Sequence, residues 1–262
     1  MIAFSSAVLF LKLRGQMQSA PATRDDSRNV VLRQLSDDEY QRIVGLAEWV
    51  SLASKEGIWE SEEEITHVFF PETAVISLVT LLDAGSIEAI TIGKDGFVGL
   101  PVYHGPRSTN TRAICQMPGT AWRLSVEAFA SVCGSSPELR AALDRYSQFV
   151  IETISQSAAC NRVHVIEERC ARWLLMSHDR VASDEIPLTQ EFLAQMLGVR
   201  RPGVTVAIGI LERAGFIGHA RGRIYVTDRP GLERASCECY RAIRNREKIL
   251  SVPQQTFVEA HV

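Results

Sequence analysis

The chain has 262 residues, of which 46% are hydrophobic and 23% charged, and its formal net charge at pH 7 is −3. This size allows two modest domains with a buried core in each, and the composition excludes a disordered or fibrous chain. Apolar runs fall well short of the ~20 residues that cross a bilayer, and the short run 8–11 precedes Lys12 and Arg14, the wrong order for a signal peptide. We therefore expect a cytoplasmic protein without a membrane partner.

Residues 1–29 are expected to form a mobile leader, or to reflect an over-long start assignment with Met17 as the true start, and order is expected to begin near Val30. Ser36 and Glu39 have the spacing of a capping box, in which each side chain satisfies a backbone N–H of the other at a helix start. Apolar residues at helical spacing predict that this helix continues through Val50.

Between residues 58 and 124 the pattern changes to short runs rich in β-branched and aromatic residues, separated by Gly, Pro and Asp turn signals. The runs are ITHVFF (65–70), VISLVTLL (75–82), SIEAITIG (86–93), GFVGLPVY (96–103), TRAICQM (111–117) and GTAWRL (119–124). Many short strands without intervening helices predict an antiparallel roll or sandwich, in an α+β chain. We assign residues 30–134 to this domain.

A long helix is predicted over residues 135–164, because Ser136-Pro137-Glu138 combines a capping serine, a first-turn proline and an acid. Its apolar stripe has near-heptad spacing. One interpretation is a helix lying on the β-domain, and the one we favour is a homodimer seam. The stripe comprises Leu139, Leu143, Tyr146, Val150, Thr153 and Ser157.

Six cysteines are scattered along the chain, at positions 115, 133, 160, 170, 237 and 239. They form no CxxC pair, so the sequence predicts buried thiols in a reducing cytosol rather than a metal site. Cys237 and Cys239 are the closest pair, but on one helix their side chains would diverge by ~200°, which makes joint ligation unfavourable.

The C-terminal part, residues 165–250, has the pattern of a winged helix, with a tail at 251–262. Thr189 can cap a helix that Gly198 ends, and a second apolar helical pattern begins near Arg200. A turn at Arg221-Gly222 then leads into a strand, which completes the helix-turn-helix and hairpin.

The start of the second helix is unusual, because it contains two arginines, a proline and a glycine. Proline is tolerated in a first helical turn, and Gly203 removes side-chain bulk, so the pair would permit close approach to a surface. The N-terminal end of this helix enters the major groove in helix-turn-helix proteins. Arg201 is the candidate guanine contact, Thr205 a second base-edge contact, and Arg200 a phosphate contact. The predicted DNA-binding residues are Thr189, Gln190, Arg200, Arg201, Pro202, Gly203, Thr205, Arg221 and Arg223.

These motifs resemble the Crp/Fnr transcription regulators. The similarity is strongest in LTQEFLAQMLGVRRPGVT (188–205) and LERAGFI (211–217), and it extends to FPE (70–72) and IGKDGFVG (92–99). The resemblance implies a cyclic-nucleotide-binding-like β-roll, a dimer helix after Pro137, and a homodimer on two-fold-symmetric DNA. It also allows RNA polymerase as a partner and a small-molecule effector of unknown identity.

The chain departs from the family at its ligand pocket. Members that bind cyclic AMP have a Gly-Glu-Leu segment, where this chain reads Gly99-Leu100-Pro101, and Arg112 is only roughly in register with their phosphate-binding arginine. The pocket is therefore predicted to be vestigial, without cyclic AMP binding. The iron–sulfur branch needs an N-terminal cysteine cluster, and the first cysteine here is Cys115.

Two other function classes compete with DNA binding. The winged helix could dock on a protein instead of DNA, in a chain that senses a small ligand. An enzyme is disfavoured, because the sequence has no nucleophile elbow, P-loop or dinucleotide fingerprint. Isolated His67, His104 and His164 are interpreted as surface or satisfied core residues. We expect no catalytic residues, cofactor or metal.

Overall fold

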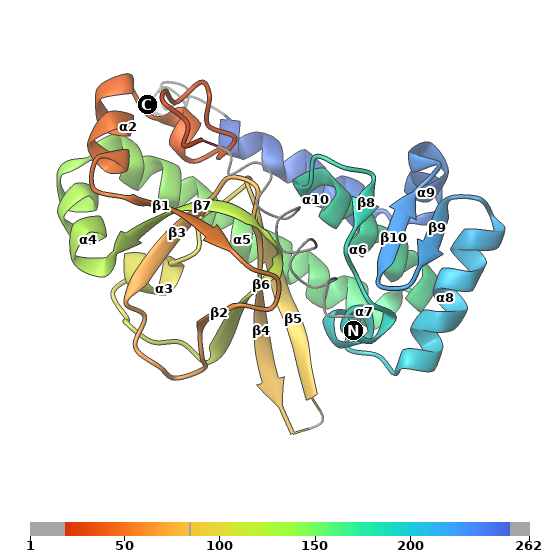
Figure 1. The fold of residues 1–262 in the computed structure, drawn as a ribbon. Coiled ribbons are helices and arrows are strands. Elements are labelled where there is room, and N and C mark those ends of the chain that lie inside the picture. The colour runs from red at the N-terminus through yellow and green to blue at the C-terminus, as the bar shows by residue number, and fades with distance from the viewer. Residues whose placement is uncertain (1–18, 84, 252–262) are drawn as a thin grey trace, which may run out of the picture.

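A computed structural model describes residues 19–83 and 85–251, so most of the expected leader and tail lie outside the described residues. Figure 1 shows a β-roll with flanking helices beside a C-terminal helical domain with a small sheet, and one long helix that joins them. This arrangement is the predicted α+β architecture. Within the described part of the chain, no helix combines the length and apolarity needed to cross a membrane.

Residues 19–29, which were expected to belong to the leader, are part of the folded β-domain. Asn29 is fully buried, and its side-chain amide donates to the carbonyls of Pro71 and Gly96 at 2.9 and 2.8 Å. The hydroxyl of Ser27 donates to the buried carboxylate of Glu72 at 2.5 Å. These bonds satisfy polar groups inside the domain, so the prediction of a leader is wrong for residues 19–29.

The first helices are shorter than predicted. A 3₁₀ turn, η1 (Leu32–Gln34), precedes α2 (Asp37–Val44), whose N-cap is Ser36 without a side-chain capping bond. The helix ends at Gly45, and the next residues form strand β1 (Glu48–Leu52). The predicted continuation to Val50 is wrong because pairing with strand β7 outweighs local helical periodicity.

The β-roll consists of two antiparallel sheets, in the orders β1-β7-β3 and β2-β6-β4-β5. Three aromatic rings in contact fill part of its core: Phe97 is stacked on Phe129 at 5.1 Å and tilted against Phe70 at 4.8 Å, measured between ring centroids. The strands are β2 (Gly57–Trp59), β3 (His67–Pro71), β4 (Val75–Leu82), β5 (Gly85–Ile92), β6 (Thr111–Met117) and β7 (Gly119–Ser125).

Residues 96–103 are not a strand. Gly99, at φ 150°, redirects the chain into the short helix α3 (Leu100–Tyr103). A Cβ at this glycine would lie 2.5 Å from the side chain of Val68, so both the backbone angle and the packing require glycine. A further helix that was not predicted, α4 (Val126–Ser135), follows β7.

The long helix α5 (Pro137–Val163) begins as predicted, with the Ser136 hydroxyl accepting the backbone N–H of Leu139 at 3.0 Å. The predicted dimer stripe, however, faces the chain's own β-roll. Leu139, Leu143, Tyr146, Val150 and Thr153 are buried within the single chain, and Ser157 is half-buried. The interpretation of this stripe as a dimer seam is therefore wrong, and the alternative, a helix lying on the β-domain, describes it.

The C-terminal domain has the predicted helix-turn-helix and hairpin. The Thr189 hydroxyl accepts the backbone N–H of Phe192 at 3.1 Å, and Gly198 ends the first helix in the left-handed conformation, at φ 63°. Its sheet has the order β8-β10-β9. The elements are α6 (Ile166–Arg180), β8 (Glu185–Ile186), α7 (Gln190–Leu197), α8 (Arg201–Arg213), β9 (Ile217–Ala220), β10 (Arg223–Val226), α9 (Arg229–Ala235), α10 (Cys239–Glu247) and η2 (Lys248–Ser251).

The two domains are in direct contact. The Arg180 guanidinium on α6 forms a buried ion pair with Asp95 of the β-roll, at 2.5 and 3.1 Å. The indole N–H of Trp173, also on α6, donates to the carboxylate of Glu88 on β5 at 2.8 Å. Helix α7 also packs on β5. The helix-turn-helix is thus held against one edge strand of the larger sheet.

Candidate nucleic-acid interface

Helix α8 begins in a way that suits an anion. Arg200 is its N-cap residue and makes no side-chain capping bond, and no acidic residue lies in the first turn. The first backbone N–H groups of a helix have no intrahelical partner and carry a partial positive charge. This end of α8 therefore presents both guanidinium groups and backbone donors to the surface.

A groove of about 490 Å³ lies between the start of α7, the start of α8 and the β9–β10 hairpin. Its lining includes five of the predicted DNA-binding residues, contributed by three separate elements: Thr189, Gln190, Arg201, Arg221 and Arg223. Thr205 lies next to these groove residues, and its hydroxyl donates a hydrogen bond to Gln190 Oε1 at 2.8 Å. The structure thus gathers residues that are up to 34 positions apart in the sequence.

The remaining predicted residues lie at the helix start. Arg200 and Pro202 are exposed. Gly203 was expected to permit close approach to an external surface, but the structure shows an internal contact. A Cβ there would lie 3.0 Å from the Ile166 side chain, so glycine permits α8 to pack on α6. Its absent side chain serves this internal contact.

Two acidic residues moderate the positive charge of the groove. Arg201 is paired with Glu191 at 3.8 Å, and Arg223 with Glu185 at 3.0 Å. The side chains of Arg201, Glu191 and Arg223 are largely exposed and that of Glu185 is partly exposed, so these pairs are weak and a phosphate could replace either carboxylate. Sequence reasoning missed both acids because they lie before the basic stretch.

The outward face of α8 also has an apolar part that was not predicted. Val206 is 57% exposed and Ile210 is 38% exposed. They follow Arg201 and Thr205 along the outward face of the helix. Aliphatic groups at such positions can contact the methyl group of thymine.

The predicted ligand pocket is divided between two elements. Gly99, Leu100 and Pro101 form the start of α3, and Arg112 lies on β6. The Arg112 guanidinium forms an ion pair with Glu60 at 3.0 Å. Leu100 and Pro101 have hydrocarbon side chains, which supply no hydrogen bond to a ribose hydroxyl.

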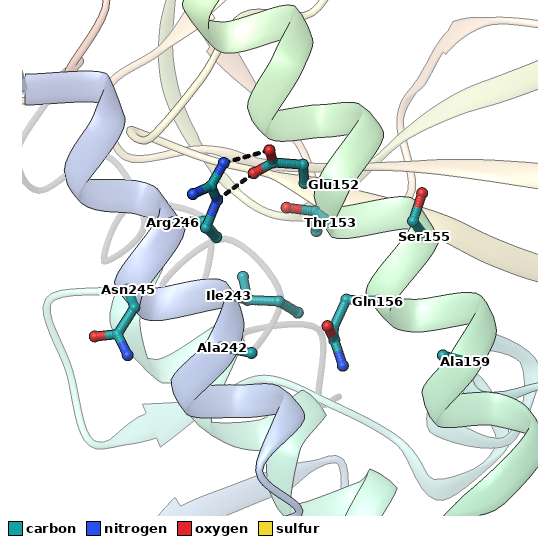
Figure 2. A pocket seen from close by; sticks show the side chains of 9 residues that line it. All are labelled: Glu152, Thr153, Ser155, Gln156, Ala159, Ala242, Ile243, Asn245 and Arg246. Carbon is teal, nitrogen blue, oxygen red and sulfur yellow. Dashed lines mark hydrogen bonds and ion pairs between the residues drawn. The ribbon is translucent and has the colours of Figure 1, made fainter.

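A second groove, of about 580 Å³, separates α5 from α10 (Figure 2). Gln156 of α5 and Ile243 of α10 line it, and an ion pair between Glu152 and Arg246 crosses it. On the same helix, Ile151 and Ile154 are 59% and 40% exposed. The exposed apolar residues of α5 are therefore different from those of the predicted stripe.

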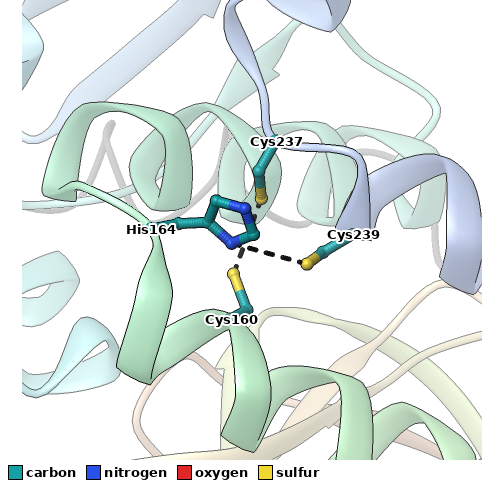
Figure 3. Close-up of side chains that lie close together, drawn as sticks. All are labelled: Cys160, His164, Cys237 and Cys239. Atoms are coloured by element: carbon teal, nitrogen blue, oxygen red, sulfur yellow. Dashed lines mark hydrogen bonds between the residues drawn. The ribbon is translucent and has the colours of Figure 1, made fainter.

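Three cysteines and a histidine come together where α5 ends and α10 begins (Figure 3). Cys237 precedes α10 and Cys239 is its first residue, so the divergence expected for two residues on one helix does not apply. Sequence reasoning missed this cluster because it joins positions that are 77 residues apart. Cys115 and Cys170 lie elsewhere, and burial raises the pKa of each thiol to about 12.

The chain is similar to a known domain family and to several solved structures. Residues 168–235 match the family model of the Crp-like helix-turn-helix domain. No curated protein matches the chain. Among solved structures, FixK2 from Bradyrhizobium japonicum superposes with a TM-score of 0.62 at 17% identity, covering 73% of this chain and 98% of FixK2. A transcriptional regulator of the CRP family from Thermus thermophilus gives 0.60 at 21% identity, covering 71% of this chain and 96% of that regulator.

A mutant of CooA from Carboxydothermus hydrogenoformans gives a TM-score of 0.57 at 13% identity and covers 79% of this chain and 94% of CooA. The likeness therefore extends over both domains, and the family model identifies the C-terminal one. The chain carries a Crp-like helix-turn-helix domain on the fold of the Crp/Fnr transcriptional regulators, which confirms the resemblance seen in the sequence.

Proposed function

We propose that the protein is a sequence-specific regulator that binds double-stranded DNA as a homodimer. The observation that carries this proposal is the groove in which Thr189, Gln190, Arg201, Arg221 and Arg223 meet. Donors from both helices of the motif and from the wing converge there. Such convergence suits a duplex, which offers phosphates on the rim of the groove and base edges at its floor.

Each contact has a distinct expected role. Arg201 is proposed to read guanine through O6 and N7, with Thr205 and Val206 as neighbouring base contacts. Thr205 is oriented by its bond to Gln190, so these two side chains would act as one polar unit. Arg200 would bind phosphate at the helix start, and Arg221 and Arg223 would hold the backbone from the wing.

Dimerisation is proposed through the outward face of α5. Ile151 and Ile154 lie one turn apart on this helix and are both exposed in the single chain. Pairing with a second copy would bury them and would place two recognition helices on a two-fold-symmetric site. The β-roll is proposed to respond to an effector other than a cyclic nucleotide.

The test is selection of bound duplexes from a random pool, followed by binding anisotropy with the selected and a scrambled duplex. A dimer that neutralises ~6–10 phosphates should lose ~10³–10⁵-fold in affinity for DNA when the salt concentration rises from ~50 to ~200 mM. A symmetric selected sequence with this salt dependence supports the proposal. Failure to enrich any sequence, together with salt-insensitive binding, would favour a protein-docking winged helix.

A further inference from the structure

We propose that Cys160, His164, Cys237 and Cys239 bind one Zn²⁺ ion that joins the end of α5 to the start of α10. One ligand atom from each residue lies within 4.8 Å of every other (Figure 3). The three cysteines are buried and form a cluster of their own, separate from the main hydrophobic core. The proposal is independent of DNA binding.

The separations fit a single tetrahedral ion. Cys160 Sγ and Cys237 Sγ are 3.5 Å apart, and Cys239 Sγ and His164 Nδ1 are 3.6 Å apart. Zn–S bonds of ~2.3 Å at tetrahedral angles place two sulfurs ~3.8 Å apart. The Cys160–His164 spacing of four residues brings both ligands to one side of the last turn of α5.

The surroundings of the ligands also fit a metal. The Nε2 atom of His164 lies 3.2 Å from the carboxylate of Glu238. A carboxylate on one ring nitrogen leaves the other free to ligate, and this outer partner is typical of zinc-bound histidine. The side-chain amide of Gln156 donates to Cys239 Sγ at 3.0 Å, so this sulfur also has an outer hydrogen-bond partner.

The charge is compensated as well. Three thiolates and a neutral imidazole around Zn²⁺ carry a net charge of −1. The guanidinium of Arg172 is buried beside the cluster and interacts electrostatically with Cys160 and Cys237. A buried anionic centre therefore has a positive partner, which lowers its cost in the interior.

The donor set distinguishes this ion from other occupants. Sulfur and imidazole ligands in a tetrahedron are typical of zinc. Four protein ligands fill the shell, so the site would be structural rather than catalytic. An iron–sulfur cluster divides its ligands among several irons and spreads them further apart than a single ion does.

The position of the site gives it a mechanical role. Two ligands come from the helix that leaves the β-roll, and two from the segment after the winged helix. The ion would fix the C-terminal domain on α5, beside the groove that α5 forms with α10. Metal binding at such a closed site contributes directly to folding.

The first measurement is metal content of the full chain, purified without chelators and under reducing conditions. We expect about one zinc per chain. Replacement by Co²⁺ should give the intense thiolate-to-cobalt absorption of a tetrahedral sulfur site. A protein that binds no zinc even after incubation with Zn²⁺, or that has a Cys160–Cys237 disulfide instead, would overturn the proposal.

Variants localise the ion. Cys237→Ser with Cys239→Ser should lose the zinc, whereas Cys133→Ser, a half-buried cysteine of α4, should keep it. Because the double variant could fail to fold, Glu238→Gln provides a milder test: zinc affinity measured against a competing chelator should fall ~10–100-fold. The exposed Glu127→Gln is its matched control. Equal affinities for these two variants would contradict the assigned outer partner and the site.

Discussion

At the scale of single residues, two neighbours at the start of α8 illustrate how backbone geometry divides roles. Arg200 has an extended backbone, at φ −72° and ψ 141°, whereas Arg201 is the first helical residue. Only Arg201 lines the groove shared with the wing. Arg200 is therefore expected to contact the sugar–phosphate backbone and Arg201 the base edges.

Arg201→Ala should remove discrimination between the selected and scrambled duplexes while leaving weak general binding. A bidentate arginine–guanine contact provides ~1–3 kcal/mol per half-site, and a dimer has two. Anisotropy with both duplexes measures the difference. Arg213→Ala, at the far end of the same helix, is the control and should keep the discrimination. Equal weakening on both duplexes by Arg201→Ala would make Arg201 a phosphate contact.

The buried ion pair between the domains is another feature of individual residues. Arg180→Met would leave the Asp95 carboxylate buried without its partner, at a cost of ~3–5 kcal/mol in the free energy of unfolding. Urea denaturation should show this loss, and Asp95→Asn in the same chain should recover part of it. Arg107→Met, which breaks only exposed pairs with Glu64 and Glu127, should cost less than ~1 kcal/mol. Similar losses in the free energy of unfolding for Arg180→Met and Arg107→Met would contradict the explanation that burial makes the Arg180–Asp95 pair more important.

At the scale of elements, α5 has two apolar faces with different partners. One is buried against the β-roll, and the other presents Ile151 and Ile154 to the surface. A near-heptad spacing indicates only that one face of a helix is buried. The same spacing suits a helix packed on a sheet and a helix packed on the same helix of a second copy. The buried face therefore could not reveal the proposed dimer surface.

Ile151→Asp and Val150→Asp separate these faces with adjacent residues. Ile151→Asp should yield a folded monomer, because two copies would place like charges together across the proposed interface. Val150→Asp should destabilise the fold itself, since it buries a charge in the chain's own core. Sedimentation and thermal unfolding distinguish the two effects. A stable dimer with Ile151→Asp would exclude this face of α5.

Most local signals were predicted well, although Ser36 forms no side-chain capping bond, and long-range signals were predicted poorly. The caps at Ser136 and Thr189 and the left-handed Gly198 follow from residue type within one helical turn. By contrast, Glu48–Leu52 became a strand only because β7 lies beside it, and Cys160 meets Cys237 only through the packing of α10 on α5. Those outcomes depend on partners that the local sequence does not contain.

The same limit applies to the candidate DNA site. The helix start at Arg200 and Arg201 could be predicted, because its proline and arginines lie within one helical turn. The acids Glu191 and Glu185, which pair with Arg201 and Arg223 from α7 and β8, could not. Their positions depend on how α7 packs beside α8 and how β8 pairs with the wing.

At the scale of the whole molecule, the helix-turn-helix rests on the β-roll rather than extending freely from it. Gly198 lies against Ile87 of β5, where a Cβ would come within 3.0 Å of that side chain, and α8 begins three residues later. A ligand that displaced β5 would therefore displace α8, the proposed recognition helix. Such a ligand must bind the two arrangements with different affinity.

Cyclic AMP and cyclic GMP are not expected to be that ligand. A ribose hydroxyl buried against Leu100 would lack a partner, at a cost of ~1–3 kcal/mol, and Pro101 has no backbone N–H for phosphate. Arg112 is already paired with Glu60. Titration calorimetry should show no saturable binding at micromolar concentration. A stoichiometric isotherm in that range would contradict this view of the pocket.

The contact between Trp173 and Glu88 gives the molecule an optical reporter of its own. The other three tryptophans, Trp49, Trp59 and Trp122, lie on strands of the β-roll. Trp173 alone is on α6, nearly buried where the domains meet. Separation of the domains would hydrate this indole and shift its emission to longer wavelength. A chain retaining only Trp173 would then follow effector binding in solution without an added dye.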